Sequence, residues 1–157
     1  MILTQNLQPN CVKLPLQGKD KLSVIIELID VLDSNDLLLN KDIAIQAVLA
    51  REQVKNTVVG SGIAIPHGKC KAVKDSVIAM GIASQPIDFG SVDSGLVNIV
   101  ILLISPSDKT KQHIQVLAEI SRMMFDETLR NKLKKINNAE EAYELLRMPL
   151  RNEVLDT

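Results

Sequence analysis

Aromatic side chains are scarce in this chain of 157 residues, which contains two Phe, one Tyr and no Trp. Proteins that bind single-stranded nucleic acid stack its bases on such rings. The formal net charge is -1, so the chain also lacks the basic excess that neutralises nucleic-acid phosphates. We therefore expect no nucleic-acid partner. We also expect a core of aliphatic residues and methionine, because 46% of the residues are hydrophobic.

Long apolar runs are absent as well. No uninterrupted apolar stretch approaches the roughly 20 residues that span a bilayer, and the first residues lack the basic start and apolar segment of a signal peptide. We expect a cytoplasmic protein that does not insert into a membrane. The only two cysteines, Cys11 and Cys70, could pair, but we interpret them as free thiols because a chain of this length does not need a disulfide.

Helical and strand-like patterns interleave along the chain. Residues 76–83 and 97–104 are apolar at successive positions, which is typical of strands covered by helices on both sides of a sheet. Residues 57–66 indicate a loop and a short strand, and residues 86–89 a short edge strand. The whole chain, residues 1–157, is expected to form one domain, an α/β sandwich. Helices are predicted over about 20–33, 40–53, 109–125, 127–134 and 139–147.

One of the two histidines follows an apolar run that stops abruptly. After Ile65 come Pro66, His67 and Gly68. Proline has no N–H and fixes φ, whereas glycine permits conformations closed to other residues. The chain is therefore expected to leave a strand and present an imidazole at its end. Because the ordinary pKa of histidine is about 6.5, a neutral imidazole is available as a nucleophile near pH 7, and His67 is our first candidate catalytic residue.

The second histidine, His113, lies in the helix predicted over 109–125. It shares one helix face with Leu117, Ile120 and Met124, so it either completes the buried face or belongs to a site. The second interpretation gains weight because a buried strand and a polar turn precede the helix, and active sites of α/β sheets lie beyond strand ends. A helix start also attracts anions. Two histidines at one strand end would suit phosphoryl transfer.

Three further residues are candidates for binding a phosphoryl group. Arg51 closes the helix predicted over 40–53, where it either complements the helix dipole or holds an anion through its planar donors. Thr57 and Ser61 offer hydroxyl groups beside glycines, although both could be ordinary turn residues. The Gly60-Ser61-Gly62 sequence does not match a known phosphate-binding loop.

A metal site is not expected. A structural zinc ion takes four ligands, and this chain offers two histidines and two cysteines in total, with Cys11 far from the others in sequence. No feature supports Cys70 as a nucleophile either. We expect no metal and no cofactor.

One stretch, Gly62-Ile-Ala-Ile-Pro-His67-Gly68, is highly specific, and other short motifs accompany it. Together they resemble the fructose/mannitol-type enzyme IIA domain of the bacterial phosphotransferase system over about residues 20–147. Residues from 86 to 113 are also similar to the nitrogen-related branch of that family. The accompanying motifs are Arg51-Glu52, Thr57, Gly60, Pro86-Ile-Asp-Phe89, Asp93, and His113 within residues 111–118.

The resemblance implies a fold, an activity and partners. The fold would be a three-layer sandwich in which a mixed β-sheet is flanked by helices on both faces. His67 would accept a phosphoryl group from an HPr-like histidine phosphocarrier protein and pass it to an enzyme IIB partner. The family's second active-site histidine corresponds to His113, and its phosphate-contacting arginine to Arg51. No metal or nucleotide would be bound.

Two functions remain open within that family. The chain is either a phosphocarrier in sugar uptake or a nitrogen-related regulatory protein that binds transporters or kinases according to its phosphorylation state. The 157 residues include no enzyme IIB or membrane IIC domain, which favours regulation. A structural α/β domain without catalytic activity is the third alternative.

Overall fold

The computed structural model describes residues 5–155, with side chains described through residue 147. Strands and helices alternate along the chain, as the sequence patterns predict. The elements are β1 (Leu7–Lys13), α2 (Lys21–Ser34), α3 (Lys41–Val54), β2 (Val58–Gly60), β3 (Ile63–Ala64), β4 (His67–Cys70), β5 (Val77–Ile87), β6 (Val97–Pro106), α4 (Thr110–Met124), α5 (Glu127–Lys135) and α6 (Ala139–Leu155).

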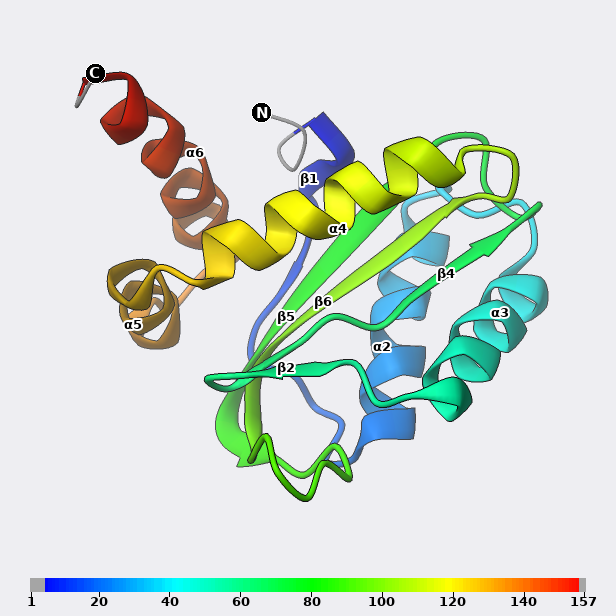
Figure 1. The fold of residues 1–157 in the computed structure, drawn as a ribbon, viewed down its shortest axis with the longest axis horizontal. Coiled ribbons are helices and arrows are strands. Elements are labelled where there is room, and N and C mark those ends of the chain that lie inside the picture. The colour runs from blue at the N-terminus through cyan, green and yellow to red at the C-terminus, as the bar shows by residue number, and fades with distance from the viewer. Residues whose placement is uncertain (1–4, 156–157) are drawn as a thin grey trace.

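Within the described residues, six strands form one mixed sheet with β5 and β6 at its centre. Its order is β1-β5-β6-β3-β2, and β4 pairs with β6 beyond the end of β3. Strands β5 and β6 are antiparallel, whereas β1 runs parallel to β5, and both β3 and β4 run parallel to β6. Helix α4 crosses one face of the sheet, α2 lies behind the other, and α3 packs against α2 and β4 (Figure 1). The predicted three-layer α/β sandwich is confirmed.

The starts of α2 and α3 agree with the sequence because local side chains cap them. Asp20 accepts a hydrogen bond from the backbone N–H of Ser23, and the Ser23 hydroxyl contacts the Asp20 backbone in return. Asn40 accepts from the N–H of Ile43 at 3.0 Å in the same manner. Such caps satisfy N–H groups that have no partner inside the helix, so a helix start is encoded within about four residues.

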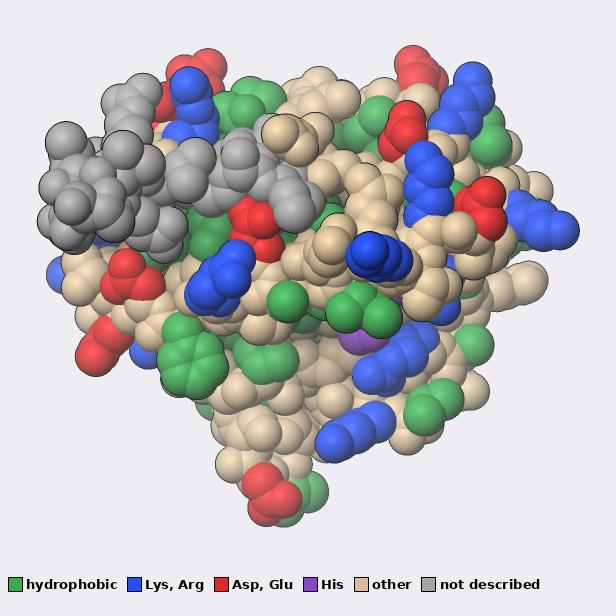
Figure 2. Space-filling view, turned by 45° about the horizontal axis from the view of Figure 1, so that its top comes forward, with side chains coloured by type: hydrophobic (Ala, Val, Ile, Leu, Met, Phe, Trp, Pro, Cys, Tyr) green, Lys and Arg blue, Asp and Glu red, His purple; other side chains and the backbone are tan. Residues whose placement is uncertain are grey.

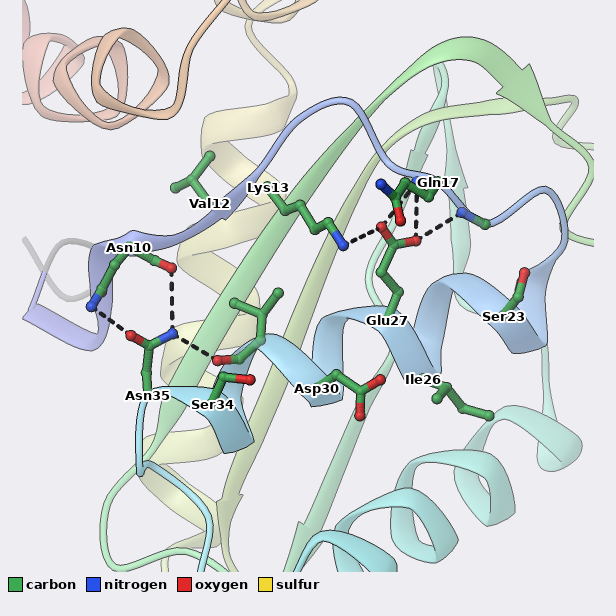
Figure 3. Close-up of a pocket in the computed structure, with 12 residues that line it drawn as sticks. Asn10, Val12, Lys13, Gln17, Ser23, Ile26, Glu27, Asp30, Ser34 and Asn35 are labelled. Carbon is green, nitrogen blue, oxygen red and sulfur yellow. Dashed lines mark hydrogen bonds and ion pairs between the residues drawn. The ribbon is translucent and has the colours of Figure 1, made fainter.

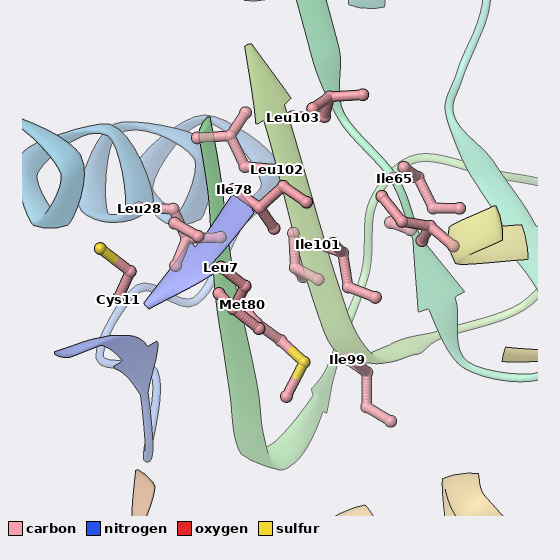
Figure 4. Packing of buried hydrophobic residues seen from close by; sticks show 14 of the residues in the cluster. Leu7, Cys11, Leu28, Ile65, Ile78, Met80, Ile99, Ile101, Leu102 and Leu103 are labelled. Carbon is pink, nitrogen blue, oxygen red and sulfur yellow. The ribbon is translucent and has the colours of Figure 1, made fainter. Parts of the chain in front are cut away.

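The core is aliphatic, as expected from the scarcity of aromatics. Its buried side chains include Leu28 of α2, Ile78 and Met80 of β5, and Ile101 and Leu102 of β6 (Figure 4). Successive residues of a strand point to opposite faces of the sheet. Burial of consecutive residues in β5 and β6 therefore confirms that helices cover both faces of these two strands.

The prediction of a separate edge strand at residues 86–89 is wrong. Pro86 and Ile87 end the central strand β5, and Ile87 pairs with Val97 of β6. The register of this pair shifts between Ile82 and Ile87. Proline cannot donate to a strand ladder, so it is accommodated where the pairing is irregular.

The C-terminal helix α6 is longer than the sequence pattern predicts. The predicted helix ended at about residue 147, two residues before Pro149, and proline removes a backbone hydrogen bond inside a helix. The helix continues to Leu155. Among the described residues, no helix is both long and apolar enough to cross a membrane.

Candidate functional site

His67 lies where a strand segment restarts after Pro66. The pairing with β6 is interrupted at Ile65 and Pro66, since proline has no N–H to donate. The chain nevertheless stays beside β6, because the N–H of Leu103 donates to the Pro66 carbonyl at 3.0 Å. His67 therefore begins strand β4 and does not end a strand, which corrects the expectation from the sequence.

The backbone fixes which ring nitrogen of His67 is available. Its Nδ1 lies 2.8 Å from the carbonyl oxygen of Ile65, and a carbonyl only accepts, so Nδ1 carries the proton. Nε2 then presents a lone pair, and no described residue donates to it. Burial lowers the pKa of His67, and the charge of Arg51 lowers it further, against the opposing effects of Ile65 and Glu52. His67 is neutral near pH 7 and nucleophilic at Nε2.

The structure brings His113 to His67. The two ring centroids are 5.5 Å apart, although the residues come from α4 and β4. His113 is buried in the first turn of α4, and its Nδ1 lies 2.7 Å from the hydroxyl oxygen of Ser105. Burial lowers the pKa of His113 to about 4, and the charges of His67 and Lys69 act in the same direction. Both histidines are therefore neutral near pH 7.

Arg51 reaches this pair because helix α3 packs directly on strand β4. A Cβ atom at Gly68 would lie 3.1 Å from backbone atoms of Ala47 and Val48, which is too close without a shift. Ala47 and Arg51 are one helical turn apart and share a face. Arg51 donates one hydrogen bond to the Lys55 carbonyl at 2.8 Å. Its remaining donors are available to an anion, because a guanidinium has five N–H groups.

Lys69 is a site residue that the sequence reasoning missed. It follows His67 by two positions in β4, so both side chains leave the same face of the strand. Its ammonium group donates to the hydroxyl of Thr110 at 3.1 Å, at the start of α4. Figure 2 shows histidine in a hollow bordered by lysine and arginine side chains. The sequence predicted that a strand ends at His67, so the alternation that places Lys69 beside His67 became visible only with β4.

These groups form a small, positively charged site around a neutral nucleophile. The sequence model of the family described as phosphoenolpyruvate-dependent sugar phosphotransferase system, EIIA 2, matches residues 5–148. The chain belongs to this enzyme IIA family. It is therefore a phosphoryl-transfer component of that system, and the resemblance inferred from the sequence motifs is confirmed.

Individual relatives point to two branches of the enzyme IIA family. The nitrogen regulatory protein of Klebsiella oxytoca is 32% identical over 147 residues, covering 92% of this chain and 89% of the relative. The crystal structure of the nitrogen regulatory protein IIA-Ntr from Neisseria meningitidis is 25% identical, with a TM-score of 0.85 over 93% of this chain and 99% of that one. Enzyme IIA mannitol of Escherichia coli, in complex with phosphorylated enzyme IIB mannitol, has a TM-score of 0.76 at 22% identity, covering 90% of this chain and 98% of that one.

Thr57 has a different partner in this enzyme IIA domain from the one expected. Its hydroxyl donates to Oε1 of the buried Glu52 at 2.6 Å, and its N–H donates to Oε2 at 3.0 Å. A hydroxyl has one proton to donate, so that proton is already engaged. The contact ties the start of β2 to the end of α3, which supports the position of Arg51.

The structure does not place Ser61 with the histidines. Ser61 lies beside Ser121 and Met124, at the far end of α4 from His113. Eleven residues of helix separate His113 from Met124, or about 16 Å along the axis. Ile63 and His67 pair with Ile99 and Leu103 of β6, four strand residues or about 13 Å apart, and Ser61 lies farther still, in the turn before β3. Both paths put Ser61 too far away to contact a phosphoryl group on His67.

A groove of about 770 Å³ lies between β1 and α2 and contains none of the site residues (Figure 3). Its charged groups hold the fold together: Glu27 accepts from the Lys13 ammonium at 2.8 Å and from the backbone N–H groups of Gln17 and Gly18. The Asn10 amide donates to the Asn35 side chain at 2.6 Å. These groups already have partners, so the groove offers little to a ligand.

The two cysteines are not members of the histidine site. Cys11 and Cys70 are free and buried, which confirms their assignment as thiols. Burial raises the pKa of Cys11 to about 11, so this thiol is protonated near pH 7. Within the described part of the chain, no three His, Cys, Asp or Glu residues are grouped as metal ligands.

Proposed function

We propose that His67 accepts a phosphoryl group at Nε2 from an HPr-like histidine phosphocarrier protein and passes it to an enzyme IIB partner. One observation carries the proposal: the Ile65 carbonyl holds the proton on Nδ1 at 2.8 Å, so the Nε2 lone pair is available. Fixing the tautomer of a nucleophilic histidine through its other nitrogen is a recurring device. Residues 1–157 act as one enzyme IIA-type domain in this proposal.

Phosphoryl transfer requires mainly that the protein position the attacking nitrogen and stabilise the charge that develops. A bond forms between Nε2 of His67 and phosphorus while the bond from phosphorus to the donor's histidine nitrogen breaks. The His67 ring gains positive charge, which the hydrogen bond from Nδ1 to the Ile65 carbonyl stabilises. Because the ring returns to its neutral form when an acceptor attacks, the phosphoryl group remains transferable.

The surrounding cations stabilise charge on the transferred group. Arg51 and Lys69 lie close enough to affect the pKa values of His67 and His113, respectively. Donors already in place before reaction cost no reorganisation when charge shifts onto the phosphoryl oxygens. His113 completes the set as a neutral hydrogen-bond donor.

Labelling tests this function directly. The protein is incubated with phosphoenolpyruvate, the first enzyme of the system and its phosphocarrier protein, and acid-labile phosphate is measured. We expect one phosphoryl group per wild-type chain and none on His67→Ala. His113→Gln is the matched control, since it keeps the nucleophile and should reach the same end point more slowly. An unlabelled wild type, or equal label on His67→Ala, would refute the assignment.

A second candidate function is regulation by phosphorylation state. It is favoured by the similarity over nearly the full chain to proteins named nitrogen regulatory protein. The carrier function is supported by the enzyme IIA mannitol complex with phosphorylated enzyme IIB. Adding a fructose-type enzyme IIB to the labelled protein separates the two. Rapid loss of label from His67 supports the carrier, whereas stable label together with target binding in one phosphorylation state supports regulation.

A further inference from the structure

A chain of buried hydroxyl groups leads to His113. The Ser76 hydroxyl lies 2.9 Å from that of Ser105, which lies 2.7 Å from Nδ1 of His113. The three residues come from the segment before β5, the end of β6 and the first turn of α4. Their exposed fractions are only 3%, 0% and 5%. Neither serine was a candidate from the sequence, and neither contacts the reacting nitrogen of His67.

The direction of the hydrogen bonds follows from counting protons. Each serine hydroxyl donates one proton and can accept others. If Ser76 donates to Ser105, then Ser105 donates to Nδ1 of His113 and both protons are used. In the reverse direction the proton of Ser76 has no acceptor among the described residues, and a buried unpaired hydroxyl is unfavourable.

This direction determines where neutral His113 carries its proton. Nδ1 accepts from Ser105, so the proton is on Nε2, the ring nitrogen left to meet His67. The Nε2 atom of His67 presents a lone pair, and the two rings are 5.5 Å apart. In the opposite tautomer of His113, the Nε2 lone pairs of both histidines would repel each other. His113 would then offer no donor to a phosphoryl oxygen.

We propose that Ser105, oriented by Ser76, is a positioning residue that holds His113 in the Nε2–H tautomer, so that His113 donates a hydrogen bond to the phosphoryl group on His67. The donation rests on the proposed function, whereas the position of the proton does not. The serines act only through His113.

Nitrogen-15 NMR of the unphosphorylated protein tests the position of the proton. Correlations between ring nitrogens and ring hydrogens distinguish the two neutral tautomers. We expect the Nε2–H tautomer of His113 in wild type at pH 7, and an increased Nδ1–H population in Ser105→Ala. A wild-type His113 protonated on Nδ1 would overturn the proposal without any transfer measurement.

Transfer rates test the consequence for catalysis. We expect Ser105→Ala to slow phosphorylation of His67 about tenfold, which corresponds to one lost hydrogen bond. Ser76→Ala leaves the Ser105 contact in place, and a loss of about threefold is expected. Ser107→Ala is the matched control in an exposed turn and should match wild type. A folded Ser105→Ala with wild-type tautomer and rate would overturn the proposal.

Two further results keep the test decisive. If Ser105→Ala does not fold, Ser76→Ala decides. Ser105 keeps Nδ1 of His113 as the acceptor of its proton in this variant, so the Nε2–H tautomer should remain the major one; an Nδ1–H majority there contradicts the proposal. Ser105→Thr retains a hydroxyl and should restore the tautomer. If wild type carries the proton on Nε2 but takes up no phosphoryl group, the proposed function and the donation fail, while the proton assignment stands.

Discussion

The histidine pair and the groove between β1 and α2 differ in the hydrogen-bonding capacity that each leaves unused. The groove is roomy, at about 770 Å³, yet both oxygens of Glu27 already accept from Lys13, Gln17 and Gly18. At the pair, Nε2 of His67 accepts from no described residue. Volume alone therefore does not identify a functional site in this protein.

The same contrast appears in the pKa values of the titratable groups at the two sites. Burial raises the pKa of Glu27, but Lys13 and two backbone N–H groups outweigh it and the pKa is lowered, so the groove stabilises a charged group. At the other site, burial and neighbouring cations lower the pKa of both histidines and keep them neutral. The groove stabilises the fold, whereas the histidine pair holds neutral rings beside cationic side chains.

The largest expected effect is a loss of stability in acid. His113 has an ordinary pKa of 6.5 when unfolded and about 4 when folded, so the unfolded state binds more protons between these values. The free energy of unfolding should fall by up to about 3 kcal/mol from pH 6.5 to 4. Urea unfolding at several pH values measures it. His113→Gln should show a shallower fall between pH 6.5 and 5; an identical slope would contradict the assigned pKa.

The next largest effect concerns the rate of transfer. His113→Ala removes a donor from the site and should slow phosphorylation of His67 about 100-fold, a typical cost of losing one such donor. Quenched-flow labelling measures the rate, and circular dichroism checks the fold. An unchanged rate in a folded variant would assign His113 to packing alone.

A substitution in the groove between β1 and α2 should lower stability and leave the rate of phosphoryl transfer unchanged. Glu27→Gln removes the charge that accepts from Lys13 and two backbone N–H groups, so we expect a loss of about 2 kcal/mol in unfolding free energy. The transfer rate per folded molecule should match wild type. Glu140→Gln, at an exposed position, is the control for the substitution itself. A slower transfer rate in folded Glu27→Gln would show that the groove also contributes to transfer.

The smallest effect is expected at Ser61. Its side chain is exposed at the far end of α4, so Ser61→Ala should change the unfolding free energy by less than about 0.5 kcal/mol. The labelling rate should equal that of wild type. A slower rate would show that Ser61 does reach a phosphoryl group on His67.

Local features of the fold could be predicted because their causes lie close together in sequence. Asp20 and Asn40 cap helices within three residues, and strands β5 and β6 are apolar at successive positions. The break at Pro66 was also predicted, but the renewed pairing of β4 was not. That pairing depends on β6, whose residues follow more than thirty positions later.

The residues of the site were partly predictable. His67, His113 and Arg51 were nominated from the sequence, and the structure places them close together. Lys69 follows from strand alternation only once β4 is known to continue past Pro66, which was not predicted, and nothing local distinguishes Ser105 or Ser76 from other serines. Thr57 and Ser61 were chosen as nearby hydroxyls, and their partners and positions depend on how α3 and the sheet pack.

The sequence by itself determined the enzyme IIA family, the aliphatic α/β core and the choice of His67 as candidate nucleophile, because these depend on composition and short motifs. Tertiary structure decided which lysine joins the site and which serines contact His113. These contacts join segments that meet only when β4, β6 and α4 pack together. The free nitrogen of His67 depends instead on the local backbone around Pro66, because its partner is the Ile65 carbonyl two residues earlier. The proton on the His113 ring is set by neighbours in space that the sequence does not record.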